Sequence, residues 1–264
     1  MPMLAIGGNL SIHYQIYHPK GRPSVLLLHG LGANGESWGY QIPALVEAGY
    51  RVLAPDARGF GKSTFPGGKN SIEIMAEDMT ALLMHLQSAP SDIVGISMGG
   101  TLALQIAIHH PELVNKLVLV NTFASLRPVQ PRLWWHFLVR FLMMHLSGMD
   151  AQANLVANNL FPRPEQAELR DILRQQINQA NPKAYRSAVR SLGLFNVQNN
   201  LGDIRAPTLV ITGENDGTVP WEIQQVMADR IPNAKQIIIP HSGHAVIADR
   251  PEEFNARLLE FLAE

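Results

Sequence analysis

Three polar side chains of this 264-residue chain have the types that nucleophilic catalysis needs, and each follows an apolar run. Ser97 is the centre of a G-x-S-x-G pattern at 95–99, Asp216 lies in Gly-Glu-Asn-Asp-Gly at 213–217, and His244 ends His-Ser-Gly-His at 241–244. A serine hydroxyl is a weak nucleophile unless an imidazole takes its proton, and the imidazole needs a carboxylate to orient it. The types and chain order of Ser97, Asp216 and His244 therefore predict acyl transfer through a serine.

The surroundings of Ser97 favour the role of nucleophile. The pattern stands between an apolar run at 92–96 and a segment at 101–108 that can form a helix, so the serine would occupy a sharp strand-to-helix turn. The glycines on either side avoid side-chain clashes in such a turn, and Gly100 leaves room for close packing of the helix. We expect the hydroxyl to stand exposed above the sheet.

Short apolar runs and helical segments alternate along the chain. The runs are typical of strands buried on both faces, and they lie at 24–29, 50–56, 92–96, 117–121, 208–212 and 236–240. Apolar residues recur at helical spacing at 74–86 and 254–262, and residues 4–17 alternate as a β-hairpin does. This pattern predicts an α/β fold with a mostly parallel sheet covered by helices on both faces, and it places ligands beyond the carboxyl ends of the strands.

One connection is far longer than the others. Residues 123–206 separate two predicted strands, which predicts a helical cap inserted between the parts of a core domain at 1–122 and 207–264. One helical stripe of the insertion consists of Leu169, Ile172, Leu173 and Ile177, and its segment 133–146 is apolar nearly all round. That segment could wall an acyl pocket, pack internally, form a dimer contact or face lipid; the candidates for substrate contact are Trp134, Trp135, Phe137 and Phe141.

Four elements together resemble those of the α/β-hydrolase fold serine hydrolases. Besides G-x-S-x-G, they are H-G-x-G at 29–32, D-x-R-G-x-G-x-S at 56–63, and G-x-x-D at 213–216 followed by G-H at 243–244. The resemblance covers nearly the whole chain outside the insertion. The chain looks most like the compact bacterial group of carboxylesterases, 3-oxoadipate enol-lactonases and cofactor-free haloperoxidases. Ser97 differs from the aspartate that haloalkane dehalogenases and epoxide hydrolases have at this position.

Residue types alone leave the acid open between Asp216 and Glu214, and the base open between His244 and His241. The resemblance implies Asp216 and His244. It also implies a carboxylesterase that forms an acyl-enzyme on Ser97 and acts on a small-molecule ester without a cofactor or metal. A lactonase of the 3-oxoadipate enol-lactonase type, a carbon-carbon bond hydrolase and an acyltransferase could use the same residues, and a slow-turnover ligand receptor could keep them.

The resemblance further implies an oxyanion hole made of backbone amides. Met98 follows the nucleophile, and Leu31 lies in the loop after the run at 24–29, so these two N–H groups would hold the oxyanion. Residues 56–63 would build a turn beside the active site. The ending Gly61-Lys62-Ser63 imitates a phosphate-binding loop, but Asp56 stands where that motif needs glycine.

Composition narrows the other classes of partner. The formal net charge is −1, so the composition shows no excess of positive charge that would favour binding to nucleic acid or to an anionic membrane surface. The absence of cysteine excludes disulfides and thiolate metal sites. The ten histidines show no metal-ligand spacing, and no apolar run is long enough to span a bilayer. The start of the chain lacks signal-peptide features, so we expect a cytoplasmic location.

A dinucleotide-binding protein is the remaining alternative, because residues 30–35 satisfy G-x-G-x-x-G. However, Gly39 and Pro43 stand where the helix of a dinucleotide-binding motif should run. The oligomeric state stays open.

Overall fold

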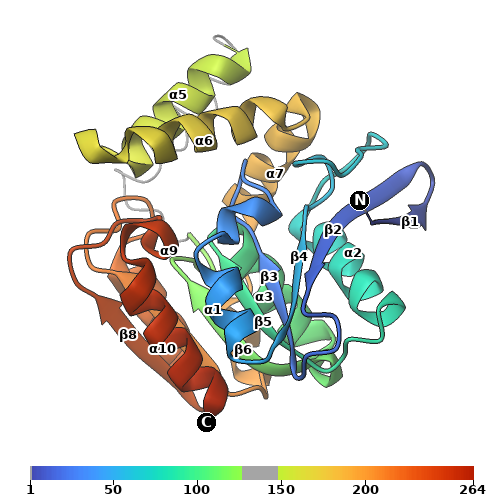
Figure 1. The fold of residues 1–264 in the computed structure, drawn as a ribbon, viewed down its shortest axis with the longest axis vertical. Coiled ribbons are helices and arrows are strands. Elements are labelled where there is room, and N and C mark those ends of the chain that lie inside the picture. The colour runs from blue at the N-terminus through green and yellow to red at the C-terminus, as the bar shows by residue number, and fades with distance from the viewer. Residues whose placement is uncertain (1, 127–147) are drawn as a thin grey trace.

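The computed structural model describes residues 2–126 and 148–264, and its centre is a twisted eight-stranded sheet (Figure 1). Across the sheet the strands follow the order β1-β2-β4-β3-β5-β6-β7-β8. The pairs β1–β2 and β2–β4 are antiparallel, and the other pairs are parallel. The strands are β1 (Met3–Gly7), β2 (Leu10–Tyr17), β3 (Ser24–Leu28), β4 (Arg51–Pro55), β5 (Ser91–Ile96), β6 (Val114–Val120), β7 (Thr208–Gly213) and β8 (Ala234–Ile239).

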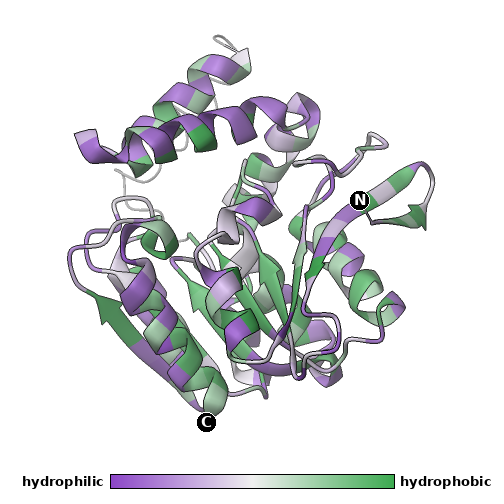
Figure 2. Cartoon of the chain, viewed as in Figure 1, coloured by the Kyte–Doolittle hydropathy of each residue, from purple (hydrophilic) through white to green (hydrophobic). Residues whose placement is uncertain are grey.

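Two hydrophobic cores lie on opposite faces of the sheet, because successive side chains of a strand point to opposite faces. In β3, Leu26 and Leu28 belong to one core, and Val25 and Leu27 to the other. The first core also contains side chains of α2 and α3, and the second contains those of α1 and α10. Figure 2 shows the strands as mainly hydrophobic ribbons between helices of mixed character. The helices of these layers are α1 (Gln41–Glu47), α2 (Ile72–His85), α3 (Met98–His109), α8 (Trp221–Arg230), α9 (Val246–Asp249) and α10 (Pro251–Ala263).

This architecture confirms the predicted fold class and the N-terminal hairpin, and it differs from the sequence prediction mainly at the ends of strands. β6 begins at Val114 rather than at residue 117, and it ends one residue early. Asn121 adopts a positive φ of 44°, a conformation that takes the chain out of the strand. The carboxyl ends of β5, β6, β7 and β8 consequently meet along one edge, where the candidate residues lie.

The described part of the insertion is helical. It contains α5 (Gly148–Leu160), α6 (Ala167–Gln179) and α7 (Pro182–Leu194), with a 3₁₀ turn η3 (Pro164–Gln166) between the first two. We call α5 and α6 the cap helices; Figure 1 shows them stacked above the core. Ser125 and Asn196 form an isolated antiparallel bridge, so the insertion leaves the core and returns to it at neighbouring points. The candidates Trp134, Trp135, Phe137 and Phe141 lie outside the described residues.

The glycine run after β3 does not open a long helix. A 3₁₀ turn, η1 (Gly35–Trp38), follows it, and α1 begins only at Gln41. Pro43 is accommodated in the first turn of α1, where the missing N–H costs no intrahelical bond. A dinucleotide fingerprint needs its glycines at the N-terminus of the helix itself, so this geometry does not match that alternative.

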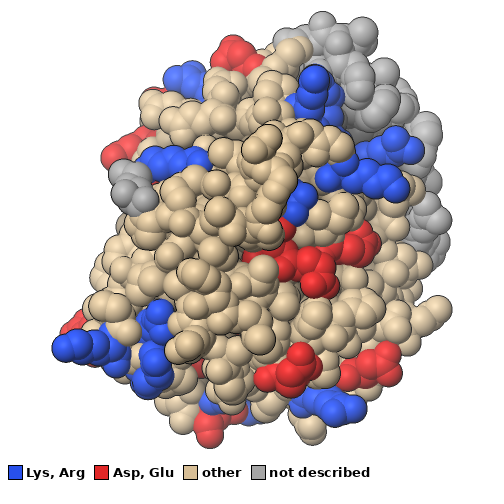
Figure 3. All heavy atoms as spheres, turned by 90° about the vertical axis from the view of Figure 1, so that its right-hand side faces the viewer, with Lys and Arg blue, Asp and Glu red and all other residues tan. Residues whose placement is uncertain are grey.

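On the face shown in Figure 3, most of the area is uncharged, and both positively charged (Lys, Arg) and negatively charged (Asp, Glu) side chains are visible. None of the helices within 2–126 and 148–264 has the length and apolarity needed to cross a membrane.

Candidate active site

Ser97 occupies the turn between β5 and α3 in a strained backbone conformation. Its φ is 53° and its ψ is −114°, values that a residue with a side chain rarely adopts. The flanking glycines are required by close packing: a Cβ on Gly99 would lie 2.0 Å from the Leu28 carbonyl oxygen, and one on Gly95 would lie 2.3 Å from the Gly99 carbonyl oxygen. The turn can therefore form only with glycine on both sides, which lifts Ser97 above the edge of the sheet.

Asp216 and His244 meet through a hydrogen bond between the loops that follow β7 and β8. His244 Nδ1 lies 2.8 Å from Asp216 Oδ2, and the Asp216 side chain is fully buried. The other carboxylate oxygen accepts the backbone N–H groups of Thr218 and Val219 at 2.8 and 2.9 Å. An ionised carboxylate is only an acceptor, so Nδ1 carries the proton and Nε2 is left with a free lone pair. That tautomer is the one a general base needs.

A buried asparagine at the end of β6 joins the two loops. The amide nitrogen of Asn121 donates to the His244 carbonyl oxygen at 2.8 Å, and its oxygen accepts the Gly213 N–H at 2.8 Å. Gln224 of α8 extends this network, with Nε2 at 3.4 Å from Asp216 Oδ2. One side chain that follows β6 thus positions the loops of both the carboxylate and the imidazole.

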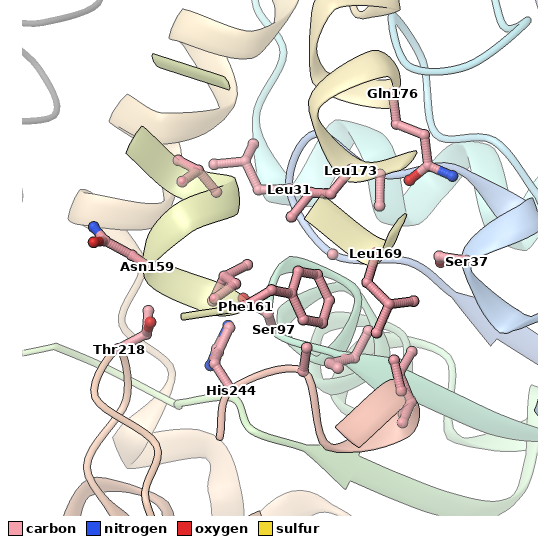
Figure 4. Close-up of a pocket in the computed structure, with 18 of the residues that line it drawn as sticks. Leu31, Ser37, Ser97, Asn159, Phe161, Leu169, Leu173, Gln176, Thr218 and His244 are labelled. Atoms are coloured by element: carbon pink, nitrogen blue, oxygen red, sulfur yellow. The ribbon is translucent and has the colours of Figure 1, made fainter. Parts of the chain in front are cut away.

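A cavity of about 410 Å³ brings Ser97 and His244 together between the core and the cap helices (Figure 4). Both side chains line it, although no hydrogen bond joins them in the structure. Such contacts often tighten only when substrate is bound. The cap helices and the segment just after α5 supply an apolar wall that includes Leu155, Leu160, Phe161, Leu169, Ile172 and Leu173.

The loop after β3 lies directly beside Ser97. A Cβ on Gly30 would be 3.7 Å from the Ser97 Cβ, and the next residue, Leu31, lines the cavity. Met98 is the first residue of α3, where backbone N–H groups have no partner within the helix. Neither the Leu31 nor the Met98 amide has an acceptor among the described residues. Two amide donors without a partner among the described residues therefore lie on either side of Ser97.

His29 supports that loop as a neutral side chain. Its Nδ1 donates to the Gly30 carbonyl oxygen at 2.8 Å, and its Nε2 accepts the Ala57 N–H at 2.9 Å. Burial lowers the pKa of His29, against the weaker opposing effects of the Gly30 carbonyl and the Asp56 carboxylate. The imidazole thus fills both of its bonds without a charge.

The segment 56–63 forms a tight turn around Asp56. Its carboxylate accepts hydrogen bonds from Gly35 N, Lys62 N and His13 Nδ1, each at 2.8 Å. A Cβ on Gly61 would lie 2.3 Å from this carboxylate. These contacts fit the structural role that the sequence predicts for the segment.

Glu214 and His241, the alternative candidates for the acid and the base, lie close to each other and outside the cavity that Ser97 lines. The His241 side chain is 79% exposed, and its Nδ1 is 3.8 Å from Glu214 Oε2. Neither residue lines the cavity that contains Ser97. Within the described residues there is no group of three or more acidic, histidine or cysteine side chains that could hold a metal ion.

Sequence reasoning did not identify the supporting residues Asn121 and Gln224, because nothing in a sequence shows which amide side chain reaches a distant loop. It did identify the stripe of Leu169, Ile172 and Leu173, and these three residues line the cavity. The same helix face continues to Gln176, three residues after Leu173, which the apolar pattern alone could not single out.

Comparisons with known proteins agree with this fold. The model of the alpha/beta hydrolase fold family matches residues 23–251. The chain is 32% identical over 262 residues to the "Putative carbamate hydrolase RutD" of Variovorax paradoxus, covering 96% of this chain and 97% of that one. The crystal structure of the enol-lactonase from Burkholderia xenovorans has a TM-score of 0.90 at 25% identity, with full coverage of both chains. A thermophilic esterase from Thermogutta terrifontis has a TM-score of 0.84 at 27% identity, covering 99% of this chain and 96% of that one. The chain is therefore a hydrolase that belongs to the α/β-hydrolase fold family.

Proposed function

We propose that this protein is a serine hydrolase that cleaves carboxylic esters through an acyl-enzyme on Ser97, with His244 as the base and Asp216 as its partner. One observation carries the proposal: an imidazole held by a buried carboxylate at 2.8 Å lines the same cavity as a serine on a strained turn. These groups supply the nucleophile, the proton acceptor and the orienting charge that acyl transfer requires.

The reaction begins when His244 Nε2 takes the proton of Ser97 as Oγ attacks the ester carbonyl. The carbonyl oxygen becomes an oxyanion, which the free amides of Leu31 and Met98 stabilise. His244 then gives its proton to the departing alcohol, leaving an ester on Ser97. Water, deprotonated by His244, then attacks the acyl carbon. The bond to Ser97 Oγ breaks, the carboxylic acid is released, and His244 returns the proton to Oγ, while Asp216 stabilises the transient imidazolium in both steps.

The lining of the cavity supports an ester with an apolar acyl group. The cap helices contribute mainly leucine, isoleucine and valine side chains, and the described lining contains no lysine or arginine. Removing an apolar chain from water at such a wall stabilises the complex. A negatively charged acyl group would find no lysine or arginine in the described wall.

The relatives raise a second candidate, hydrolysis of a carbamate, because the RutD proteins carry that name and span nearly the whole chain. A free carbamate is a small anion. The predominantly apolar wall of a 410 Å³ cavity without a described cationic residue favours an ester over such a substrate. Lactone hydrolysis stays an alternative, since the same attack opens a ring ester.

Rates on p-nitrophenyl esters of increasing acyl length, on lactones and on carbamates distinguish these candidates. We expect ester turnover, and Ser97→Ala should lower kcat by about a thousandfold or more with the melting temperature nearly unchanged. An organophosphonate should add its mass to the peptide containing Ser97 and to no other peptide. Undiminished ester turnover in Ser97→Ala would overturn the proposal, whereas activity limited to lactones or carbamates would replace only the substrate.

A further inference from the structure

The end of the cavity remote from His244 is polar, unlike the apolar wall that lies between this end and His244. Figure 4 places Gln176 and Ser37 on one side of the cavity and His244, Thr218 and Asn159 on the other. Gln176 belongs to the cap helix α6, and Ser37 to the turn η1 of the core. Gln176 is 8% exposed, so its amide is nearly withdrawn from bulk water and faces the cavity that it lines.

The hydrogen bonds around Gln176 determine which of its amide atoms is free. Asn34 Oδ1 accepts the backbone N–H of Glu36 at 2.9 Å, which identifies it as the oxygen of that side chain. The same oxygen lies 3.1 Å from Gln176, so the atom of Gln176 that faces it must be the donor, Nε2. Oε1 is then left without a donor among the described residues, and Figure 4 shows it on the opposite side of the amide from Nε2.

The neighbouring polar groups also present acceptors. Ser37 Oγ uses its proton on the Asn34 carbonyl oxygen at 2.8 Å, which leaves its lone pairs available. Glu36 lines the cavity as well, with its Oε1 3.3 Å from Nζ of Lys62, a residue outside the lining, and the described lining itself contains no lysine or arginine. This end of the cavity therefore favours a hydrogen-bond donor and disfavours an anion.

The direction of the reaction assigns this end to the acyl group. His244 must protonate the departing alcohol, so the alcohol leaves on the His244 side, and the acyl group attached to Ser97 extends away from it. We infer that Gln176 Oε1 accepts a hydrogen bond from a donor, such as a hydroxyl, near the end of an otherwise apolar acyl chain. The inference rests on the proposed function and names a class of substrate: esters of ω-hydroxy or similarly donor-tipped acids.

Pairs of p-nitrophenyl esters test, in the native protein, whether Gln176 Oε1 accepts a hydrogen bond from the acyl chain. At each acyl length, one member ends in methyl and the other in hydroxyl, with chains long enough not to cyclise. A hydroxyl without a partner lowers kcat/KM, because it loses apolar contact and its bonds to water. We expect the hydroxyl-to-methyl ratio of kcat/KM to rise about tenfold at one chain length. A ratio that stays low at every length overturns the inference, as does faster turnover of an ω-carboxylate ester.

Gln176→Met keeps a side chain of similar length without the amide, and it should lower that ratio about tenfold at the preferred length. The matched control is Gln152→Met, since Gln152 is a buried glutamine of α5 that does not line the cavity, and it should leave the ratio unchanged. A purely structural role of Gln176 would slow both esters equally. An unchanged ratio in Gln176→Met, with Ser97→Ala inactive, would reject the donor site alone, whereas active Ser97→Ala would reject the proposed function.

Discussion

His29 is a buried side chain whose uncharged state supports the loop beside Ser97. Its two nitrogens make one bond as a donor and one as an acceptor, an arrangement that only the neutral imidazole can provide. Protonation would set an N–H against the Ala57 N–H. The low pKa of His29 that burial produces is therefore a requirement of the loop and not an incidental effect.

This burial makes stability depend on pH in a definite direction. The unfolded chain protonates His29 below about pH 6.5, whereas the folded chain does so only at lower pH, so the stabilisation is present above that value and is lost as the pH falls. Between pH 7.5 and 5.5 the native protein should therefore lose more of its free energy of unfolding than His29→Gln does. Urea denaturation at both pH values measures the difference, and equal losses would contradict it.

The turn that contains Ser97 depends on the close packing of α3 against the sheet. Gly99 lies against the carbonyl oxygen of Leu28 on β3, and a methyl group there would overlap it. Gly99→Ala should destabilise the protein by about 3 kcal/mol or more, because a backbone atom cannot move aside as a side chain can. Thermal denaturation checks this.

Gly193, within α7, is the matched control for that substitution. Nothing lies within 4 Å of the position its Cβ would take, and its φ is not positive. Gly193→Ala should therefore be neutral or stabilise by up to about 1 kcal/mol through its better helix propensity. A similar loss for both variants would show that close packing at Gly99 is not the cause.

Asn121 links three strand ends, so its removal should disturb activity more than its single side chain suggests. Asn121→Ala leaves the Gly213 N–H and the His244 carbonyl oxygen without a partner in a buried place. We expect a loss of about 1–3 kcal/mol in stability and at least about a tenfold lower kcat, because His244 is less well oriented. Asn115→Ala, at the other end of β6, should leave kcat unchanged; a comparable fall there would contradict this positioning role.

The core and the insertion are joined next to His244. Asp249 is nearly buried; its Oδ2 accepts the Gly243 N–H at 2.8 Å, and its Oδ1 accepts Gln166 Nε2 of η3 at 2.6 Å. Arg163 adds a looser contact at 3.4 Å. Since Gly243 immediately precedes His244, docking of the insertion and placement of the imidazole share one carboxylate.

Asp249→Ala should therefore affect both the docking of the insertion and the placement of the His244 imidazole. We expect faster amide hydrogen exchange in η3 together with a lower kcat, and a stability loss of about 1–3 kcal/mol from the unpaired Gly243 N–H. Arg163→Ala should change stability by less than about 1 kcal/mol, because its contact is long and half exposed. Faster exchange without any change in kcat would separate docking from the imidazole.

Most of the fold could be predicted from local patterns, whereas the catalytic roles of Ser97, Asp216 and His244 stay predictions. The apolar runs predict β3 to β7 because a strand buried on both faces needs apolar side chains, and G-x-S-x-G predicts the turn because only glycine fits beside it. The run at 236–240 also predicts a strand, but β8 lies at the edge of the sheet, and Ile238 is 47% exposed. The predicted ends of strands are less accurate. In β6 the end differs because the conformation of Asn121 depends on its contacts with segments that follow other strands. The boundaries of the insertion and the cytoplasmic location stay predictions.

The sequence by itself determined the α/β class, the order of Ser97, Asp216 and His244, and the apolar stripe of α6. These properties follow from residue type and from spacing within one element. Only the tertiary structure decided that Asp216 rather than Glu214 meets the imidazole, that Asn121 joins their loops, and that Gln176 lines the cavity. Each of these depends on atoms that are far apart in the chain and close in space, and the free energy of packing the whole molecule sets that closeness.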